Sequence, residues 1–183
     1  MTIKKIAEVK AEISSQFADN TSKAITPAKL RLVVEDIADS FKDTIAILDC
    51  TENTVAVSLS VTPIVLAGVW NGPTRADTGM SVQPLTGSIT GFSSPGFDHS
   101  FEFVATMFGS TADIEARLYV NGSPTLATDE ISLQGNNRPQ TLKLSSYWQA
   151  IPAGAVFSLW IKANKTISVQ MPRGFMRLTR KPT

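Results

Sequence analysis

The sequence is poor in the residues from which disulfides, metal clusters and many catalytic sites are built. Cys50 is the single cysteine and His99 the single histidine among 183 residues. One cysteine cannot form a disulfide within the chain, and together with one histidine it cannot complete a zinc site in a single chain. We therefore expect no disulfide framework, no metal and no cofactor.

An excess of positive charge is also missing. The chain has 17 Lys and Arg against 16 Asp and Glu, for a formal net charge of +1. Up to Asp49 there are seven basic and eight acidic residues, and the remainder has ten basic and eight acidic residues. Binding to the phosphate backbone needs a basic surplus, so we expect no nucleic-acid partner.

Long hydrophobic runs are absent as well. No stretch approaches the roughly 20 apolar residues that cross a bilayer. The N-terminal stretch MTIKKIAEVKAEISSQF interrupts its apolar residues with Lys and Glu, so it lacks the apolar region of a signal peptide. We expect a protein that is made in a cytoplasm and does not insert into membranes.

Helical periodicity is confined to the first part of the chain. Apolar residues recur there at steps of three and four, first at Ile6, Val9, Ile13 and Phe17, and then at Leu30, Val33, Val34, Ile37 and Phe41. Polar turn-forming residues separate the two sets, and Thr26-Pro27 supplies an N-cap followed by a proline at the first helical position. This pattern predicts two short helices.

After Cys50 the apolar period changes to two, which indicates half-buried strands. Alternating sets occur at Val55–Val61, Phe101–Met107, Ile114–Val120, Leu142–Leu144, Phe157–Ile161, Ile167–Met171 and Phe175–Arg180, and Ile64–Trp70 is an apolar run. Asn121-Gly122 is a hairpin signal. About eight to ten short strands without intervening helices are typical of a sandwich or jelly roll.

The predicted fold class is therefore mainly β: an antiparallel β-sandwich or jelly roll preceded by a short two-helix N-terminal arm. We place the helical anchoring or oligomerisation arm at residues 1–48 and the β-sandwich domain at residues 49–183. Helices of this length are marginal alone in water, so they need tertiary contacts. The arm packs against copies of itself, docks on another protein, or covers an open face of the sandwich.

Two stretches resemble known families. Ile25–Phe41, ITPAKLRLVVEDIADSF, resembles a segment near the N-termini of tailed-bacteriophage virion proteins. Tyr147–Arg180 is similar to the final strands of trimeric tumour-necrosis-factor-like jelly rolls, with a Pro-Ala-Gly turn and a last strand ending in a basic residue. The resemblance implies a non-enzymatic tail fibre, head fibre or capsid decoration protein, usually a homotrimer, synthesised in the host cytoplasm and located in the virion. Its partners would be its own copies and other virion structural proteins.

Candidate chemistry is sparse. Asp98-His99-Ser100 joins an acid, the histidine and a hydroxyl, but adjacent residues of an extended chain point to opposite sides, so we predict an ordinary loop. A metal held by His99 and its symmetry mates on a trimer axis is a minor alternative. Calcium could bind scattered acids, but these lack the spacing of a calcium loop: Asp77, Asp113, Asp129 and Glu130.

Aromatic and basic residues offer two further candidates. We assign Trp70 and Trp160 to the core or a subunit seam, while Trp148, beside a turn, is the possible ligand contact, because exposed aromatic faces stack on sugars. The C-terminal basic residues are Arg173, Arg177, Arg180 and Lys181. They either protect a strand edge or contact an acidic capsid or tail surface.

The sequence favours a non-enzymatic structural component of a phage particle that assembles through its N-terminal helices and displays the β-sandwich. We assign assembly to the apolar stripes: Ile6, Val9, Ile13, Phe17, Leu30, Val33, Ile37 and Phe41. The alternatives are a fibre tip that binds a host receptor or surface glycan, a polysaccharide hydrolase, and a cytokine-like ligand. No catalytic residue is assigned.

Overall fold

The computed structural model describes residues 6–16, 27–40, 43–135 and 138–181. The chain divides into two compact units, a helical unit of Met1–Asp43 with Lys181–Thr183 and a β unit of Thr44–Arg180. The division follows Asp43 rather than residue 48, because Thr44–Thr51 is a strand of the β unit.

The helical unit contains helices α1 (Ile6–Gln16) and α2 (Pro27–Ser40). Pro27 is the first residue of α2, as its preset φ and missing amide hydrogen favour. The two helices pack against each other, with Val9 and Val33 only 5% and 3% exposed. Both predicted helices are therefore present, each with part of its apolar stripe buried.

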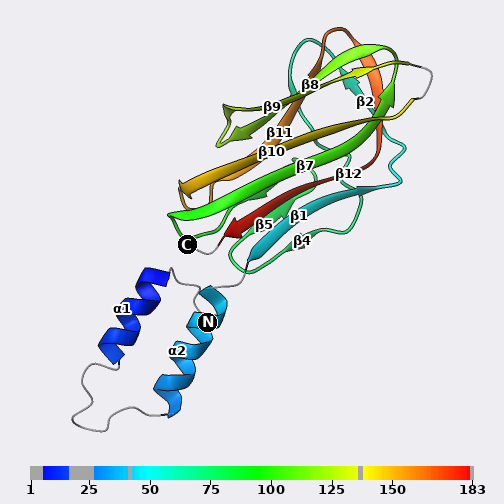
Figure 1. Ribbon diagram of the computed structural model, residues 1–183. Helices are drawn as coiled ribbons and strands as arrows, with labels where there is room; N and C mark the ends of the chain where they lie inside the picture. Colours follow the sequence, from blue (N-terminus) through cyan, green and yellow to red (C-terminus); the bar gives the residue numbers. More distant parts are fainter. Residues whose placement is uncertain (1–5, 17–26, 41–42, 136–137, 182–183) are drawn as a thin grey trace. The chain divides into compact units, whose positions relative to one another are not determined.

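The β unit consists of two antiparallel sheets that face each other across one core (Figure 1). The first sheet has the order β10 (Gln140–Ile151), β7 (Phe97–Gly109), β12 (Ile167–Lys181), β1 (Thr44–Thr51) and β4 (Arg75–Ala76), with β2 (Ala56–Leu59) paired to β12. The second has the order β5 (Ser81–Gln83), β6 (Ser88–Thr90), β11 (Val156–Ala163), β8 (Ala112–Val120) and β9 (Ser123–Leu133), with β3 (Ile64–Val65) paired to β11. This arrangement is a jelly roll and confirms the predicted fold class.

The core is built from the predicted alternating residues. Strand β7 buries Phe101, Phe103, Ala105 and Met107, while β8 buries Ile114, Ala116 and Leu118 and β11 buries Phe157, Leu159 and Ile161. Phe101 of the first sheet stacks on Phe157 of the second, with ring centroids 6.3 Å apart. The period of two in the sequence therefore marks the faces that meet between the sheets.

The hairpin between β8 and β9 forms where Asn121-Gly122 predicted it. Asn121 and Gly122 have φ angles of 51° and 76°. Positive φ at both central residues is the type I′ geometry, whose twist matches that of the flanking strands.

Three strand predictions need correction. Ile64–Trp70 is not one strand: β3 ends at Val65, and Gly68 turns the chain with a φ of +73°. Val55 and Val61 lie outside β2 and are exposed. The segments predicted at Ile167–Met171 and Phe175–Arg180 are one strand, β12.

Pro172 lies inside β12 at a point where a proline is tolerated. Residues 167–170 pair with β2 and residues 173–180 pair with β1, so Pro172 falls between these two pairing segments. A proline has no amide hydrogen to donate to a neighbouring strand, and at Pro172 neither β1 nor β2 requires such a donor. The apolar alternation in the sequence is interrupted near Pro172, but the strand continues through this residue.

Candidate functional site

His99 is part of the core and not of a loop, which corrects the sequence prediction. It lies on β7 and is fully buried, with its ring stacked on Phe157. Nε2 accepts a hydrogen bond from the Phe92 amide over 3.2 Å, so Nδ1 carries the proton and donates to the Phe97 carbonyl over 3.1 Å. Burial lowers the pKa of His99, and the charge of Arg180 lowers it further. In this buried state both ring nitrogens are engaged in hydrogen bonds, so neither is available to bind a metal.

Asp98 and Ser100 point away from His99, as expected of neighbours on a strand. Both lie on the outer side of β7, and the Asp98 carboxylate accepts hydrogen bonds from the Tyr147 hydroxyl and from the Ala150 amide, the latter over 2.9 Å. The three consecutive residues therefore do not converge, and they form no nucleophilic triad.

The four acids considered for calcium are not gathered at one place: Asp113 and Glu130 line the same hollow, whereas Asp77 and Asp129 lie elsewhere and hold other partners. Asp77 accepts from the Ile45 amide and pairs with Arg75, and Asp129 accepts from the Lys143 amide over 2.8 Å. In the described part of the chain, no three His, Cys, Asp or Glu side chains are placed to hold a metal ion. Cys50 is buried, and its thiol donates to the Met171 carbonyl.

The aromatic candidates occupy three different environments. Trp70 is in the core, as predicted, where its indole N–H donates to the Leu66 carbonyl over 2.8 Å. Trp160 is not in the core: it projects from the outer face of β11 and stacks on Tyr119. Trp148 lies within β10 and is half-buried, whereas its neighbour Tyr147 is 55% exposed. A ligand contact at Trp148 stays a prediction.

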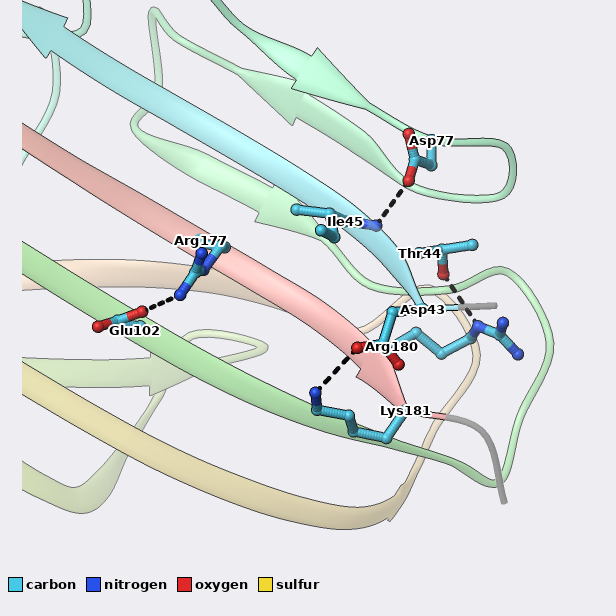
Figure 2. A network of polar contacts seen from close by, with 8 residues as sticks. All are labelled: Asp43, Thr44, Ile45, Asp77, Glu102, Arg177, Arg180 and Lys181. Atoms are coloured by element: carbon cyan, nitrogen blue, oxygen red, sulfur yellow. Dashed lines mark hydrogen bonds and ion pairs between the residues drawn. The ribbon is translucent and has the colours of Figure 1, made fainter. Parts of the chain in front are cut away.

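The C-terminal basic residues do not protect a strand edge, because β12 lies between β7 and β1. Arg177 forms an ion pair with Glu102, and Lys181 pairs with Asp43 over 3.0 Å (Figure 2). Arg180 is fully buried, while Arg173 is exposed. The four basic residues therefore do not share one role, because the fold places them in different environments.

The predicted assembly residues divide into buried and exposed positions. Val9 of α1 and Val33 of α2 are buried, and Ile13 and Ile37 are half-buried. Leu30 is 52% exposed. Ile6 lies in α1, but its side chain, like Phe17 and Phe41, falls outside the described part of the chain.

Helix α2 exposes apolar side chains beyond the predicted apolar stripe. Leu32 and Val34, at 51% and 53%, are as exposed as Leu30. Leu30 and Val34 are four residues apart and share one side of the helix, whereas Leu32 lies on another side. The described part of the helical unit thus leaves two apolar sides of α2 uncovered.

A second candidate surface is the outer face of the first sheet. Half-buried apolar side chains project there from β1, β7 and β12: Ile45, Ile47, Val104, Phe108 and Phe175. The Arg177–Glu102 ion pair lies in the same face, and Arg177 also stands 5.6 Å from the ring centre of Phe175. We call this surface the sheet face.

Two shallow hollows shape the sheet face. One of about 430 Å³ is lined by Asp49, Val104, Arg173 and Phe175 among others, and one of about 390 Å³ by Ser100, Glu102, Tyr147 and Arg177 among others. Both combine apolar and charged groups. Such a mixture is typical of surfaces that bind another protein.

The fold of the β unit is similar to that of several solved structures. No family model and no curated protein matches the sequence. Among solved structures, the Eiger TNF of S. frugiperda superposes with a TM-score of 0.51 at 13% identity, covering 76% of this chain and 93% of that one. Murine APRIL (TM-score 0.49, 14% identity, 76% and 99% covered) and the globular domain of zebrafish complement 1qA (0.43, 15%, 74% and 94%) superpose with lower TM-scores.

The β unit therefore has a tumour-necrosis-factor-like jelly-roll fold. A structural likeness at such low sequence identity shows the fold alone. The likeness confirms the part of the sequence resemblance that concerned the jelly roll. In the described part of the chain, no helix combines the length and apolar character needed to span a membrane.

Proposed function

We propose that this chain is a non-enzymatic structural component of a bacteriophage particle that self-associates as a homotrimer. Two observations support the proposal: the tumour-necrosis-factor-like jelly roll, and the resemblance of Ile25–Phe41 to the N-terminal helix of tailed-phage virion proteins. The β unit is displayed on a fibre or capsid, and the helical unit attaches it. We place the domains at the division after Asp43.

The exposed apolar surface of α2 supports a role of the helical unit in attachment. Two paired helices bury Val9 and Val33 but leave Leu30, Leu32 and Val34 half-exposed. Fully burying one such side chain stabilises by roughly 1.5–3 kcal/mol. A second copy of the helical unit, or another virion protein, would recover that free energy by covering these side chains.

The sheet face supplies a second contact between copies in this proposal. The same face contains the ion pair between Arg177 and Glu102, whose side chains are 43% and 28% exposed, respectively. An ion pair this exposed contributes little by itself, and it would be shielded from water when copies meet. The proposal therefore assigns the helices to anchoring and the sheet face to contact between neighbouring jelly rolls.

The proposal is tested on the purified full-length chain by sedimentation equilibrium. The wild type is expected to be a trimer, and the double variant Leu30→Glu/Val34→Glu is expected to lose subunits. Arg31→Glu is the matched control, because it places the same charge at an exposed polar position of α2. A monomeric wild type at micromolar concentration contradicts self-association.

The particle itself tests the location. Antibodies against the β unit are expected to label intact phage particles in electron microscopy. If purified particles contain none of this protein, the virion proposal is wrong, whatever the subunit number.

A further inference from the structure

The outer face of the second sheet carries a polar groove that the assembly proposal does not use. It runs along β8 and β11, with a hollow of about 250 Å³ whose polar lining is Asp113, Glu115, Glu130, Lys162 and Asn164. A smaller hollow of about 90 Å³ continues past Glu115 and Lys162 to Arg117, Tyr119 and Trp160. The groove and the sheet face belong to different sheets of the sandwich.

The first end of the groove is held rigid by hydrogen bonds across neighbouring segments. The Asp113 carboxylate accepts from the Ser132 hydroxyl over 2.6 Å and from Asn164 Nδ2 over 2.8 Å. The Asn164 side-chain oxygen accepts in turn from the Asp113 amide over 3.2 Å. Polar groups fixed in this way lose little conformational freedom when a ligand binds.

The middle of the groove is an ion-pair cluster. Glu115 contacts Lys162 over 2.6 Å and Arg117 over 3.1 Å. The hydrogen bond from Lys162 is the main cause that lowers the pKa of Glu115. Glu130 lies opposite Glu115 on β9 and is exposed, so its carboxylate is open to a ligand.

The far end of the groove is aromatic. The rings of Tyr119 and Trp160 stack with centroids 4.6 Å apart and planes 23° from parallel. The indole N–H of Trp160 and Nε of Arg117 are buried and have no hydrogen-bond partner in the described part of the chain. A buried donor without a partner costs free energy.

The charges of the groove restrict the ligand. Three carboxylates (Asp113, Glu115 and Glu130) face two cations (Arg117 and Lys162), so an anionic ligand is disfavoured. Carboxylate and amide oxygens accept from hydroxyl groups, Lys162 and Asn164 donate to them, and an aromatic surface suits the C–H face of a sugar ring. We propose that this groove binds an uncharged saccharide, one or two rings in size.

This proposal replaces Trp148 by Trp160 as the aromatic contact. Binding sites commonly combine apolar walls with a few convergent polar groups, and the groove has both, with Val61 and Pro63 along its edge. Trp148 pairs with the buried His99 and lines neither hollow of the groove, although its indole N–H is also buried without a partner in the described part of the chain. The inference does not depend on assembly, because none of the groove residues lies in α1, α2 or the sheet face.

The full-length protein is titrated with methyl glycosides of glucose, galactose and N-acetylglucosamine, and binding is measured by ligand-observed NMR. At least one is expected to bind in the millimolar range, up to about 10 mM. Trp160→Phe and Glu130→Gln are each expected to weaken binding roughly tenfold, the effect of losing one well-placed contact. The matched controls Trp148→Phe and Glu35→Gln are expected to leave it unchanged.

Each other outcome overturns the inference. Absence of binding by a folded wild type, equal binding by Trp160→Phe and Glu130→Gln, or loss of binding only in Trp148→Phe would each do so. Tighter binding of sialic acid than of the neutral sugars would contradict the charge argument. Sedimentation of the same variants separates the two proposals, since the groove variants are expected to keep the wild-type subunit number.

Discussion

Arg180 and Thr44 meet at the paired ends of β12 and β1, where Nε of the guanidinium donates a hydrogen bond to the threonine hydroxyl over 2.9 Å (Figure 2). Both side chains are buried. The guanidinium also lies 5.1 Å and 4.9 Å from the ring centres of Phe92 and Phe97. The aromatic faces and the threonine hydroxyl stabilise the charge in this position instead of water.

Thr44→Val removes one acceptor of the buried guanidinium while keeping the side-chain shape. We expect a loss of about 2 kcal/mol in the free energy of unfolding, because hydrogen bonds to charged groups are worth about 1.5–3 kcal/mol. Urea denaturation measures the loss. Thr128→Val, at an exposed position of β9, is the matched control and should change the value by less than about 0.5 kcal/mol. An equal effect of the two variants would contradict the role of Thr44.

Stability should decrease as the pH falls below about 6.5, the usual pKa of histidine. Burial lowers the pKa of His99 in the folded state, so the unfolded chain takes up the proton first. This part of the stability is complete above pH 6.5 and is lost below it. Urea titrations at about pH 7.5 and about pH 5.5 should show the decrease in the wild type and a smaller one in His99→Gln.

Glu115 does not interfere with that measurement. Its lowered pKa makes its contribution present above about pH 4.5 and lost only at lower pH. An identical decrease for His99→Gln between pH 7.5 and 5.5 would show that another group titrates in this window.

Gly87 is required both for its backbone angle and for its lack of a side chain. Its φ is +61°, and a Cβ atom there would lie 2.1 Å from the Leu66 carbonyl oxygen, the acceptor of the Trp70 indole. Gly87→Ala should therefore destabilise by about 3 kcal/mol, combining left-handed strain with a steric clash.

Gly122 provides the control for this variant, since it has a φ of +76° but open space around the position of a Cβ. Gly122→Ala should cost only the backbone term, about 1–2 kcal/mol. Thermal unfolding of both variants gives the comparison. Equal losses would show that the contact with Leu66 does not matter.

Phe175 tests the sheet face. It is half-buried in the β unit beside Arg177, and Phe175→Glu should reduce the subunit number in sedimentation because it places a charge in the proposed contact. Leu85→Glu is the control, since Leu85 is 88% exposed in the turn between β5 and β6. Loss of subunits in both variants would point to a general effect on folding.

Local patterns predicted the elements that depend on neighbouring residues. The alternation in Phe101–Met107 and Ile114–Val120 marked β7 and β8 because side chains on a strand point alternately to two faces. Strand β1 was missed because Thr44–Thr51 follows directly on the helical pattern, and β9 because its burial is only partial. The groove was missed because the hairpin of β8 and β9 forms it together with β11, which is distant from that hairpin in the sequence.

By itself, then, the sequence determined that two amphipathic helices precede a set of alternating strands, since both periodicities are properties of adjacent residues. Only the tertiary structure decided that His99 and Arg180 are buried. Segments remote in the chain cover both side chains: Phe157 of the second sheet stacks on the imidazole, and the Thr44 hydroxyl accepts a hydrogen bond from the guanidinium. No local pattern contains those partners, because burial of a polar group depends on what the fold places around it.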